Sequence, residues 1–339
     1  MEESGVTRPS RVAVVGATGL VGQTLLTVLG ERFPGLEHVR ALAECGGGRT
    51  VQFAGRTLPV EAISEEALAE ADVVFLAATS AVSERFGPWA AARGALVVDK
   101  SSRFRMDPEV PLVVPEVNGH LIQRGGQLVA SPNCSTIALV LPLHALLRHR
   151  RVTRVLVSTY QAVSGTGREA LMQLEAEMAD GLGGEVRGTA YPKPIAGNVL
   201  AQCDHLDDAG YTLEEWKLTR ESEKILGTRL RLSATAVRVP VRIGHAEAVY
   251  VELDRPVDPE AVRDWLRATP GIVVVEDPDY PTPREAAGSD AVYVGRVRRD
   301  LHEPTGLHLF IVADNLRKGA ATNAVQILEQ SLFGESVRS

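Results

Sequence analysis

Cys134 is the residue whose surroundings point most directly to chemistry, within the segment SPNCSTI (131–137). A predicted strand ends before this segment, proline and asparagine turn the chain, and a predicted helix begins near the cysteine. The N-terminus of a helix lowers the pKa of a thiol and so populates the thiolate, which is the nucleophilic form. A buried structural cysteine is the alternative, and the local sequence leaves both interpretations open.

A thiol nucleophile also needs a group that moves protons, and histidine titrates in the appropriate range. His245 follows a glycine after the end of a predicted strand, which modestly favours it for this role. The chain has 8 histidines, and His144, His149 and His205 are nearly as plausible from their local sequence.

Basic residues in three segments are candidates for binding an anionic substrate. They are Arg103 and Arg105, then Lys224 with its helical neighbour Glu221, and finally Arg238 and Arg242. Taken singly, each group is more often a solvated surface or a surface ion pair worth at most about 1 kcal/mol. The basic segments therefore do not assign a site on their own.

A glycine-rich turn near the N-terminus has the context of a dinucleotide-binding site. GATGLVG (16–22) follows a predicted buried strand and opens a predicted helix. Its glycines let the backbone approach a pyrophosphate, and the helix N-terminus supplies N–H groups with positive partial charge. The spacing is GxxGxxG rather than GxGxxG, and a strand–helix turn without a ligand is the alternative.

The end of the second predicted strand bears on the choice between NAD and NADP. An acidic residue there accepts from the 2′-hydroxyl of NAD, whereas an arginine suits the 2′-phosphate of NADP. Glu44 stands at this end and favours NAD, while Arg49, five residues later, favours NADP. A solvated loop is the alternative for either residue.

Two patterns of predicted elements divide the chain. The first half alternates strands at 11–17, 39–43, 72–78, 95–99 and 127–130 with helices at 20–29, 65–70 and 82–93. This alternation predicts a parallel, doubly wound, Rossmann-like sheet. The second half has strands at 152–162, 230–240, 246–253, 271–275, 292–298 and 306–313, and helices at 169–180, 213–226 and 318–332. Its period-2 alternation predicts an α+β domain with a mainly antiparallel sheet covered by helices on one face.

Composition excludes several classes of protein. A chain of 339 residues, 45% hydrophobic and 23% charged, is expected to form two globular domains. A net charge of −7 argues against partners such as nucleic acid or an anionic membrane. Three cysteines do not form a disulfide framework or a zinc pattern, and we expect no metal. With no signal-like or membrane-spanning stretch, we expect a cytoplasmic location.

Seven segments, taken in order, resemble the aspartate-β-semialdehyde dehydrogenase family. They are GATGLVG (16–22), SPNCSTI (131–137), TYQAVSGTGREA (159–170), ESEKILG (221–227), VRVPVRIGHAEAV (237–249), VGRVRRD (294–300) and ADNLRKGAATNAVQI (313–327). Their order and spacing, rather than any single segment, carry the resemblance, which extends from Arg11 to about Phe333.

The resemblance implies a reaction. NADPH reduces L-4-aspartyl phosphate to L-aspartate 4-semialdehyde with release of phosphate, a step that feeds lysine, threonine, methionine and diaminopimelate biosynthesis. By resemblance Cys134 forms an acyl-thioester, His245 is the acid/base and Gln161 orients the substrate. Alternatives are an enzyme like N-acetyl-γ-glutamyl-phosphate reductase and a catalytically silent dinucleotide-binding paralogue.

Binding roles follow from the same resemblance. Arg238 pairs with the substrate α-carboxylate and Glu221 with its ammonium group. Arg105 and Lys224, with help from Asn133, bind the phosphate. The implied cofactor-binding residues are Gly16, Thr18, Gly19, Leu20, Val21, Gly22, Glu44, Arg49, Ser164, Gly165 and Asn315.

Two positions depart from the family pattern. The family commonly has Asp-Asn-Ser-Ser before its phosphate arginine, and this chain has Lys100 in place of the asparagine. The serine and arginine that commonly bind the NADP phosphate are replaced by ECGGGR (44–49). The resemblance implies NADP as the cofactor, and Glu44 supports NAD or dual use as the alternative.

The resemblance also implies the domain plan. We expect residues 1–133, completed by the C-terminal helix at 318–339, to form the dinucleotide-binding domain. Residues 134–317 are expected to form the catalytic and dimerisation domain of a homodimer that takes a small-molecule substrate and phosphate.

Overall fold

The computed structural model describes residues 11–123, 126–181 and 188–334. The chain divides into two compact units. Unit 1 comprises residues 1–132 and 320–339, and unit 2 comprises residues 133–319. In the described residues, no helix is both long and apolar enough to cross a bilayer.

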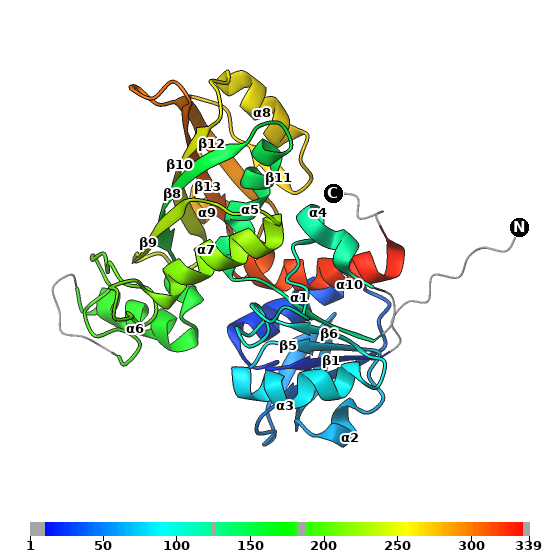
Figure 1. The fold of residues 1–339 in the computed structure, drawn as a ribbon. Coiled ribbons are helices and arrows are strands. Elements are labelled where there is room, and N and C mark those ends of the chain that lie inside the picture. The colour runs from blue at the N-terminus through cyan, green and yellow to red at the C-terminus, as the bar shows by residue number, and fades with distance from the viewer. Residues whose placement is uncertain (1–10, 124–125, 182–187, 335–339) are drawn as a thin grey trace, which may run out of the picture. The chain divides into compact units, whose positions relative to one another are not determined.

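Unit 1 is built on a seven-stranded sheet in the order β3-β4-β2-β1-β5-β6-β7 (Figure 1). The strands are β1 (Arg11–Val15), β2 (His38–Ala43), β3 (Thr50–Phe53), β4 (Arg56–Ala62), β5 (Val73–Leu76), β6 (Leu96–Asp99) and β7 (Gln127–Ala130). Every pairing is parallel except β3 with β4. β1 lies in the middle of the sheet. β2 to β4 are added on one side of β1, and β5 to β7 are added on the other side, so the predicted doubly wound fold is confirmed.

Helices cover both faces of this sheet (Figure 1). They are α1 (Leu20–Arg32), α2 (Glu65–Leu68), α3 (Ser80–Ala91), α4 (Pro115–Asn118), the 3₁₀ turn η1 (Gly119–Leu121) and α10 (Asn323–Phe333). Alternate residues of β1 face opposite sides: Val14 packs in one apolar cluster with α1 and α10, and Val15 packs in the other with α2 and α3. Arg32 and Glu329 form an ion pair of 2.8 Å that ties α10 to α1.

The hairpin of β3 and β4 was not predicted from the sequence. Ala54 and Gly55 join the two strands with φ of 45° and 76°. Such a turn suits a two-residue hairpin, in which both central residues take positive φ. The strands carry a weak hydrophobic signal because β4 buries only Val60, and Pro59 interrupts the pattern.

Unit 2 is built on a six-stranded sheet in the order β11-β12-β13-β10-β8-β9. The strands are β8 (Val152–Gln161), β9 (Leu232–Arg238), β10 (His245–Leu253), β11 (Ile272–Val274), β12 (Val292–Arg299) and β13 (Gly306–Ala313). The central pairings β12–β13, β13–β10 and β10–β8 are antiparallel, which confirms the mainly antiparallel prediction. The outer pairings β8–β9 and β11–β12 are parallel, because crossovers containing helices join those strands.

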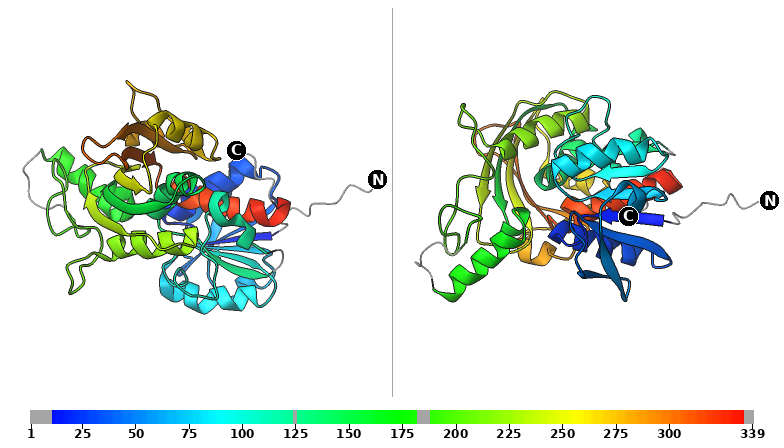
Figure 2. Two further views of the ribbon diagram at one scale, coloured as in Figure 1. Left: turned by 45° about the horizontal axis from the view of Figure 1, so that its top comes forward. Right: turned by 90° about the horizontal axis from the view of Figure 1, so that it is seen from below.

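Three helices of unit 2, at residues 134–147, 213–226 and 259–267, pack on one face of its sheet (Figure 2), whereas the short helix at 283–286 packs on the opposite face against Ala246 and Val312. The elements of this unit are α5 (Cys134–Leu147), η2 (Val163–Gly165), α6 (Arg168–Ala179), α7 (Leu213–Leu226), α8 (Pro259–Arg267), α9 (Pro283–Ala286) and the start of the π-helix η3 (Arg317–Thr322). Residues such as Val155 and Val249 are buried against α5 and its neighbours. The opposite face leaves Tyr160 38% exposed and holds a hollow of about 260 Å³ lined by Leu156, Tyr250 and Phe310.

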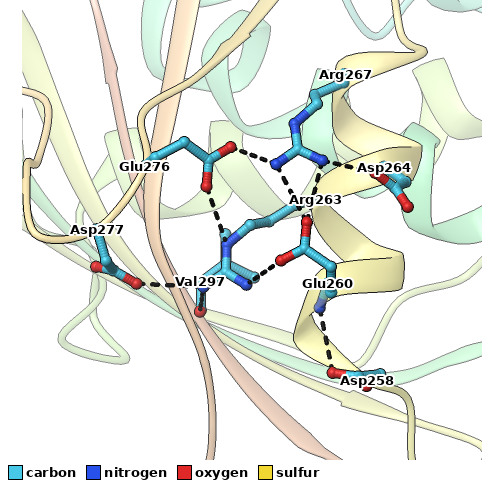
Figure 3. A network of polar contacts seen from close by, with 8 residues as sticks. All are labelled: Asp258, Glu260, Arg263, Asp264, Arg267, Glu276, Asp277 and Val297. Atoms are coloured by element: carbon cyan, nitrogen blue, oxygen red, sulfur yellow. Dashed lines mark hydrogen bonds and ion pairs between the residues drawn. The ribbon is translucent and has the colours of Figure 1, made fainter.

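A network of arginines and carboxylates fixes α8 to the sheet (Figure 3). Arg263 donates to Glu260 at 3.0 Å, to Asp277 at 3.2 Å and to the Val297 carbonyl of β12 at 2.8 Å. Arg267 binds Asp264 at 2.6 Å and joins Glu260 and Glu276 to the same network. The network anchors the segment after β11, whose continuation reaches Pro283 beside Gly244, the residue that precedes His245.

Candidate active site

Cys134 is the first residue of α5, as the sequence predicted. Asn133 caps this helix, and its side-chain oxygen accepts a hydrogen bond from the Ser135 backbone N–H at 3.0 Å. The thiol is partly exposed, whereas α5 is buried along most of its length. The cysteine therefore has the helix position that favours a thiolate and enough exposure to meet a substrate.

The π-helix η3 passes close to this cysteine. A Cβ on Gly319 would lie 2.9 Å from the Cys134 Cβ, so only glycine allows the approach. Asp314 holds the turn, because its Oδ1 accepts from the backbone N–H groups of Leu316 at 2.8 Å and Arg317 at 2.9 Å. The helix predicted at 318–332 is present, but its first part is a π-helix over residues 317–322 and α10 begins at Asn323.

Two carboxylates of α7 lie near the N-terminus of α5, where Cys134 is the first residue. Glu221 is 1% exposed, and its Oε2 accepts from the Asn133 backbone N–H at 2.7 Å. Glu214 accepts from the Gln161 amide at 3.1 Å through Oε1 and from the Asn133 amide at 3.1 Å through Oε2. Lys224 follows Glu221 by three residues on the same helix. The structure thus joins Asn133, Gln161 and Glu221, which the sequence placed far apart.

Arg238 and His245 come together at the ends of β9 and β10. Arg238 is 6% exposed and donates from Nη1 to the Ala162 carbonyl at 2.8 Å. His245 accepts at Nδ1 from the Ala162 backbone N–H at 3.0 Å. A Cβ on Gly165 would lie 3.0 Å from Arg238 Nη1 and 3.2 Å from His245 Nε2, so both side chains border this glycine.

Burial and the Arg238 charge lower the pKa of His245 from 6.5 to about 3. The imidazole is therefore neutral at physiological pH. Because Nδ1 accepts a hydrogen bond, the hydrogen-bond network assigns the proton to Nε2. No partner for Nε2 lies among the described residues, so this N–H can donate to a bound group.

Family models decide the classification of the chain. The model "Semialdehyde dehydrogenase, NAD binding domain" matches residues 11–124, and "Semialdehyde dehydrogenase, dimerisation domain" matches residues 142–318. The aspartate-semialdehyde dehydrogenase of Legionella pneumophila is 43% identical over 335 residues, covering 96% of each chain. The chain belongs to the aspartate-semialdehyde dehydrogenase family. The resemblance read from the seven segments is thereby confirmed.

Other aspartate-semialdehyde dehydrogenases are similar to this chain over nearly its full length. The Bacillus subtilis aspartate-semialdehyde dehydrogenase is 41% identical, covering 95% of this chain and 97% of its own. The crystal structure of aspartate semialdehyde dehydrogenase II from Vibrio cholerae has a TM-score of 0.91 and 41% identity, covering 95% of this chain and 98% of its own. A second structure of that enzyme, complexed with ASA, also has a TM-score of 0.91, at 40% identity.

Two glycines of the turn at residues 16–22 are required by the fold, and a third, Gly19, is not. Gly16 has φ of +79°, and a Cβ there would lie 2.1 Å from the Ala77 carbonyl oxygen. A Cβ on Gly22 would lie 2.1 Å from the Gly16 oxygen, so the fold itself requires both glycines. Gly19 tolerates a Cβ, whose nearest contact would be 3.4 Å, and it caps α1 without a side chain. A glycine that the fold does not require fits the close approach of a pyrophosphate to the helix N-terminus.

The other cofactor-binding candidates of this segment, Thr18, Leu20 and Val21, lie in the same turn.

Glu44 and Arg49 lie in the segment after β2. The Glu44 carboxylate accepts from the Thr79 hydroxyl at 3.3 Å, at the start of α3. Arg49 donates to the carbonyls of Gly46, at 3.2 Å, and Cys45. The guanidinium is thus engaged by its own loop, whereas the carboxylate stands at the strand end where a ribose 2′-group is expected.

The remaining candidate residues each form hydrogen bonds with neighbouring groups of their own unit. Arg105, in unit 1, is 8% exposed and donates from Nη2 to the Lys100 carbonyl at 2.8 Å. The Lys100 ammonium, at a position that departs from the family pattern, donates to the Ser131 hydroxyl at 2.9 Å. In unit 2, Asn315 accepts from the Gly244 N–H at 2.9 Å and donates to the Ser164 hydroxyl at 3.0 Å. These bonds tie the ends of three segments together beside His245.

Glu247 is a buried acid that the sequence analysis did not single out. It is 1% exposed, and its two carboxyl oxygens have no hydrogen-bond partner among the described residues. Burial, with a contribution from the Glu214 charge, raises its pKa well above the usual 4.5. Glu247 therefore stays protonated in the folded protein at neutral pH.

This burial gives a prediction about stability. Above pH 4.5 the unfolded chain releases the Glu247 proton while the folded chain keeps it, so stability falls as pH rises. We expect Glu247→Gln to raise the melting temperature at pH 7.5 by about 2 °C, with the difference shrinking towards pH 4.5. Glu169→Gln, at an exposed position of α6, is the matched control. A difference that does not change with pH would contradict the assignment.

Proposed function

We propose that this protein reduces L-4-aspartyl phosphate to L-aspartate 4-semialdehyde, with release of phosphate. The proposal is supported by the arrangement of Cys134 at a helix N-terminus beside a buried carboxylate, Glu221, that is bonded to the preceding backbone. Named relatives are aspartate-semialdehyde dehydrogenases, which favours this function over the acetylglutamyl-phosphate and silent alternatives. The product supplies amino-acid biosynthesis.

In the proposed reaction the Cys134 thiolate attacks the acyl carbon, the carbon–oxygen bond to phosphate breaks, and phosphate leaves. The nicotinamide dinucleotide supplies the hydride that reduces the resulting thioester. The Nε2–H of the neutral His245 donates a hydrogen bond to the oxygen that gains negative charge as hydride addition forms the tetrahedral thiohemiacetal anion. The carbonyl re-forms from this oxygen's electron pair as the carbon–sulfur bond breaks, and the aldehyde and the Cys134 thiolate separate.

Substrate binding is assigned by charge. An amino-acid head group carries an ammonium and a carboxylate, and Glu221 and Arg238 are a buried anion and a buried cation that match them. Arg105, Lys224 and Asn133 are proposed to bind the phosphoryl oxygens, whose negative charge two cations offset. Gln161 is proposed to orient the acyl group. Ser164, Gly165 and Asn315 are proposed to border the nicotinamide.

Steady-state oxidation of L-aspartate 4-semialdehyde tests this function. The proposal requires turnover that depends on phosphate, because phosphate is the group that cleaves the thioester in this direction. Oxidation that proceeds equally well without phosphate, or no oxidation by folded protein, would contradict it.

We propose NADP as the cofactor, with NAD as the alternative that Glu44 supports. A carboxylate beside the 2′-phosphate repels it, so Glu44→Ala is expected to raise the kcat/KM ratio of NADPH to NADH by about tenfold. Glu37→Ala removes the same charge from a position before β2 and should leave the ratio unchanged. A wild-type ratio well above ten that Glu44→Ala does not alter would exclude a role for Glu44 in cofactor choice.

A homodimer is proposed from the match to the dimerisation domain model and from the face of the unit 2 sheet that bears Tyr160 and Phe310. Exposed Tyr160 and the hollow beside Phe310 make that face the surface proposed for the second copy. Sedimentation velocity distinguishes this dimer from a monomer. A cytoplasmic location is proposed with the biosynthetic role.

A further inference from the structure

Glu214 in the first turn of α7 connects two residues of the proposed active site. Glu214 is 6% exposed, and its side chain accepts hydrogen bonds at both carboxylate oxygens. Oε1 accepts from the Gln161 amide at 3.1 Å, and Oε2 accepts from the Asn133 amide at 3.1 Å. One buried carboxylate therefore links the end of β8 to the residue that precedes Cys134.

These bonds fix the direction of the Gln161 side chain. Its amide nitrogen donates to Glu214 and also to the Thr159 hydroxyl at 3.3 Å. An amide nitrogen has two N–H groups, so both are engaged within the protein. The carbonyl oxygen of Gln161 is then the end that can accept from a bound group.

Asn133 is held in a similar way. Its side-chain oxygen caps α5 by accepting from Ser135, and its amide nitrogen donates to Glu214. The side chain therefore cannot rotate without losing either the helix cap or the contact with Glu214. Because Asn133 is adjacent to Cys134, this restraint acts on the segment that carries the nucleophile.

A lysine and a neutral buried acid lie near the Glu214 carboxylate. Lys217 lies 3.3 Å from Oε2 and is itself held by Asp204 at 2.7 Å. Glu247, a buried acid near it, is held neutral by burial and by the Glu214 charge. An ionised carboxylate accepts stronger hydrogen bonds than a neutral group does, which suits a residue that restrains two amides.

We propose that Glu214 is a positioning residue of the reaction, which holds Gln161 and Asn133 in the orientation that the acyl substrate requires. The inference rests on the proposed function for its kinetic readout. Glu214 itself is assigned no contact with substrate or cofactor.

Glu214→Gln is the direct test, because it keeps size and shape but can accept at only one end. The other end presents an N–H to a neighbouring amide N–H, so one of the two restraints is lost. We expect kcat for phosphate-dependent aldehyde oxidation to fall by about tenfold to a hundredfold. Glu214→Asp, which keeps the charge on a shorter side chain, should fall between the wild type and Glu214→Gln.

Glu215→Gln is the matched control on the same helix turn. Glu215 is also buried, and it accepts from the backbone N–H groups of Thr212 at 2.7 Å and Ala236 at 2.9 Å. These bonds hold α7 against β9 without touching a proposed site residue. We expect this variant to lower the melting temperature and to keep kcat within about twofold of the wild type.

A double-mutant cycle separates positioning from a general structural role. If Glu214 acts largely through Gln161, Glu214→Gln should lower kcat much less in a Gln161→Ala background than in the wild type. Equal factors in both backgrounds, or an unchanged kcat in folded Glu214→Gln, would overturn the inference.

A readout without turnover keeps the inference separate from the proposed function. An inactive wild type would contradict the function alone. A crystal structure of ligand-free Glu214→Gln then decides the inference, since Gln161 or Asn133 should adopt a changed side-chain orientation. Both side chains in their original positions would overturn it, and Glu214→Asp serves the same purpose if the glutamine variant does not fold.

Discussion

Replacing Cys134 with alanine is expected to lower phosphate-dependent oxidation of L-aspartate 4-semialdehyde by at least about a thousandfold. The thiolate forms and breaks the covalent bond in the proposed reaction, and no other group can take its place when the sulfur is removed. The measurement is kcat/KM of the purified variant, with circular dichroism to show that it is folded.

Cys203→Ala is the control for the loss of a thiol. Cys203 is 2% exposed, and burial raises the pKa of its thiol to about 12, so it is not a thiolate at neutral pH. This variant should retain activity within about threefold of the wild type. Activity of Cys134→Ala near that of the wild type would show that the reaction does not use this cysteine.

His245→Gln is expected to lower kcat by roughly 10²–10³-fold, the usual cost of removing one donor to an oxygen that develops negative charge. The same histidine determines an unusual pH dependence. Its pKa of about 3 means that it is already neutral far below physiological pH. We therefore expect no loss of kcat/KM from protonation of His245 as the pH falls from 8 to 5.

His205→Gln provides the comparison, because His205 is exposed and lies in the same unit. It should leave kcat unchanged. Two results would contradict the assignment of His245: a glutamine variant within about threefold of the wild type, or an acid limb near pH 6.5 that disappears in that variant.

Sequence patterns predicted the fold where the hydrophobic signal was strong. β1, β5 and β6 are buried runs of apolar residues, and α7 was predicted with its observed bounds because it begins at a capping residue and ends at Gly227. The signal failed at β4, which buries only Val60. It also did not indicate that residues 317–322 are π-helical, because the backbone bonds of Asp314 and the contact with Cys134 depend on tertiary structure.

In the candidate site, too, the sequence did not indicate residues whose role depends on tertiary contacts. Residue types and the family resemblance brought Cys134, Glu221, Arg238 and His245 forward, and the structure describes the surroundings of each. Glu214, Glu247, Asp314 and Gly319 were missed, since each matters through side-chain or backbone contacts made across the fold. Asp314 and Gly319 lie inside the segment ADNLRKGAATNAVQI and Glu247 lies inside VRVPVRIGHAEAV, so the resemblance offered a signal for these three. Glu214 lies outside all seven segments.

The central claim is that an aspartyl thioester forms on Cys134, and it can be observed directly. The enzyme is mixed with L-aspartate 4-semialdehyde and the oxidised dinucleotide without phosphate, and absorbance and intact mass are recorded together. We predict a burst of reduced dinucleotide of about one equivalent per chain, with one aspartyl group added to the peptide that contains Cys134 and none in Cys134→Ala. Steady turnover without a covalent adduct, or an adduct on another residue, would contradict the account.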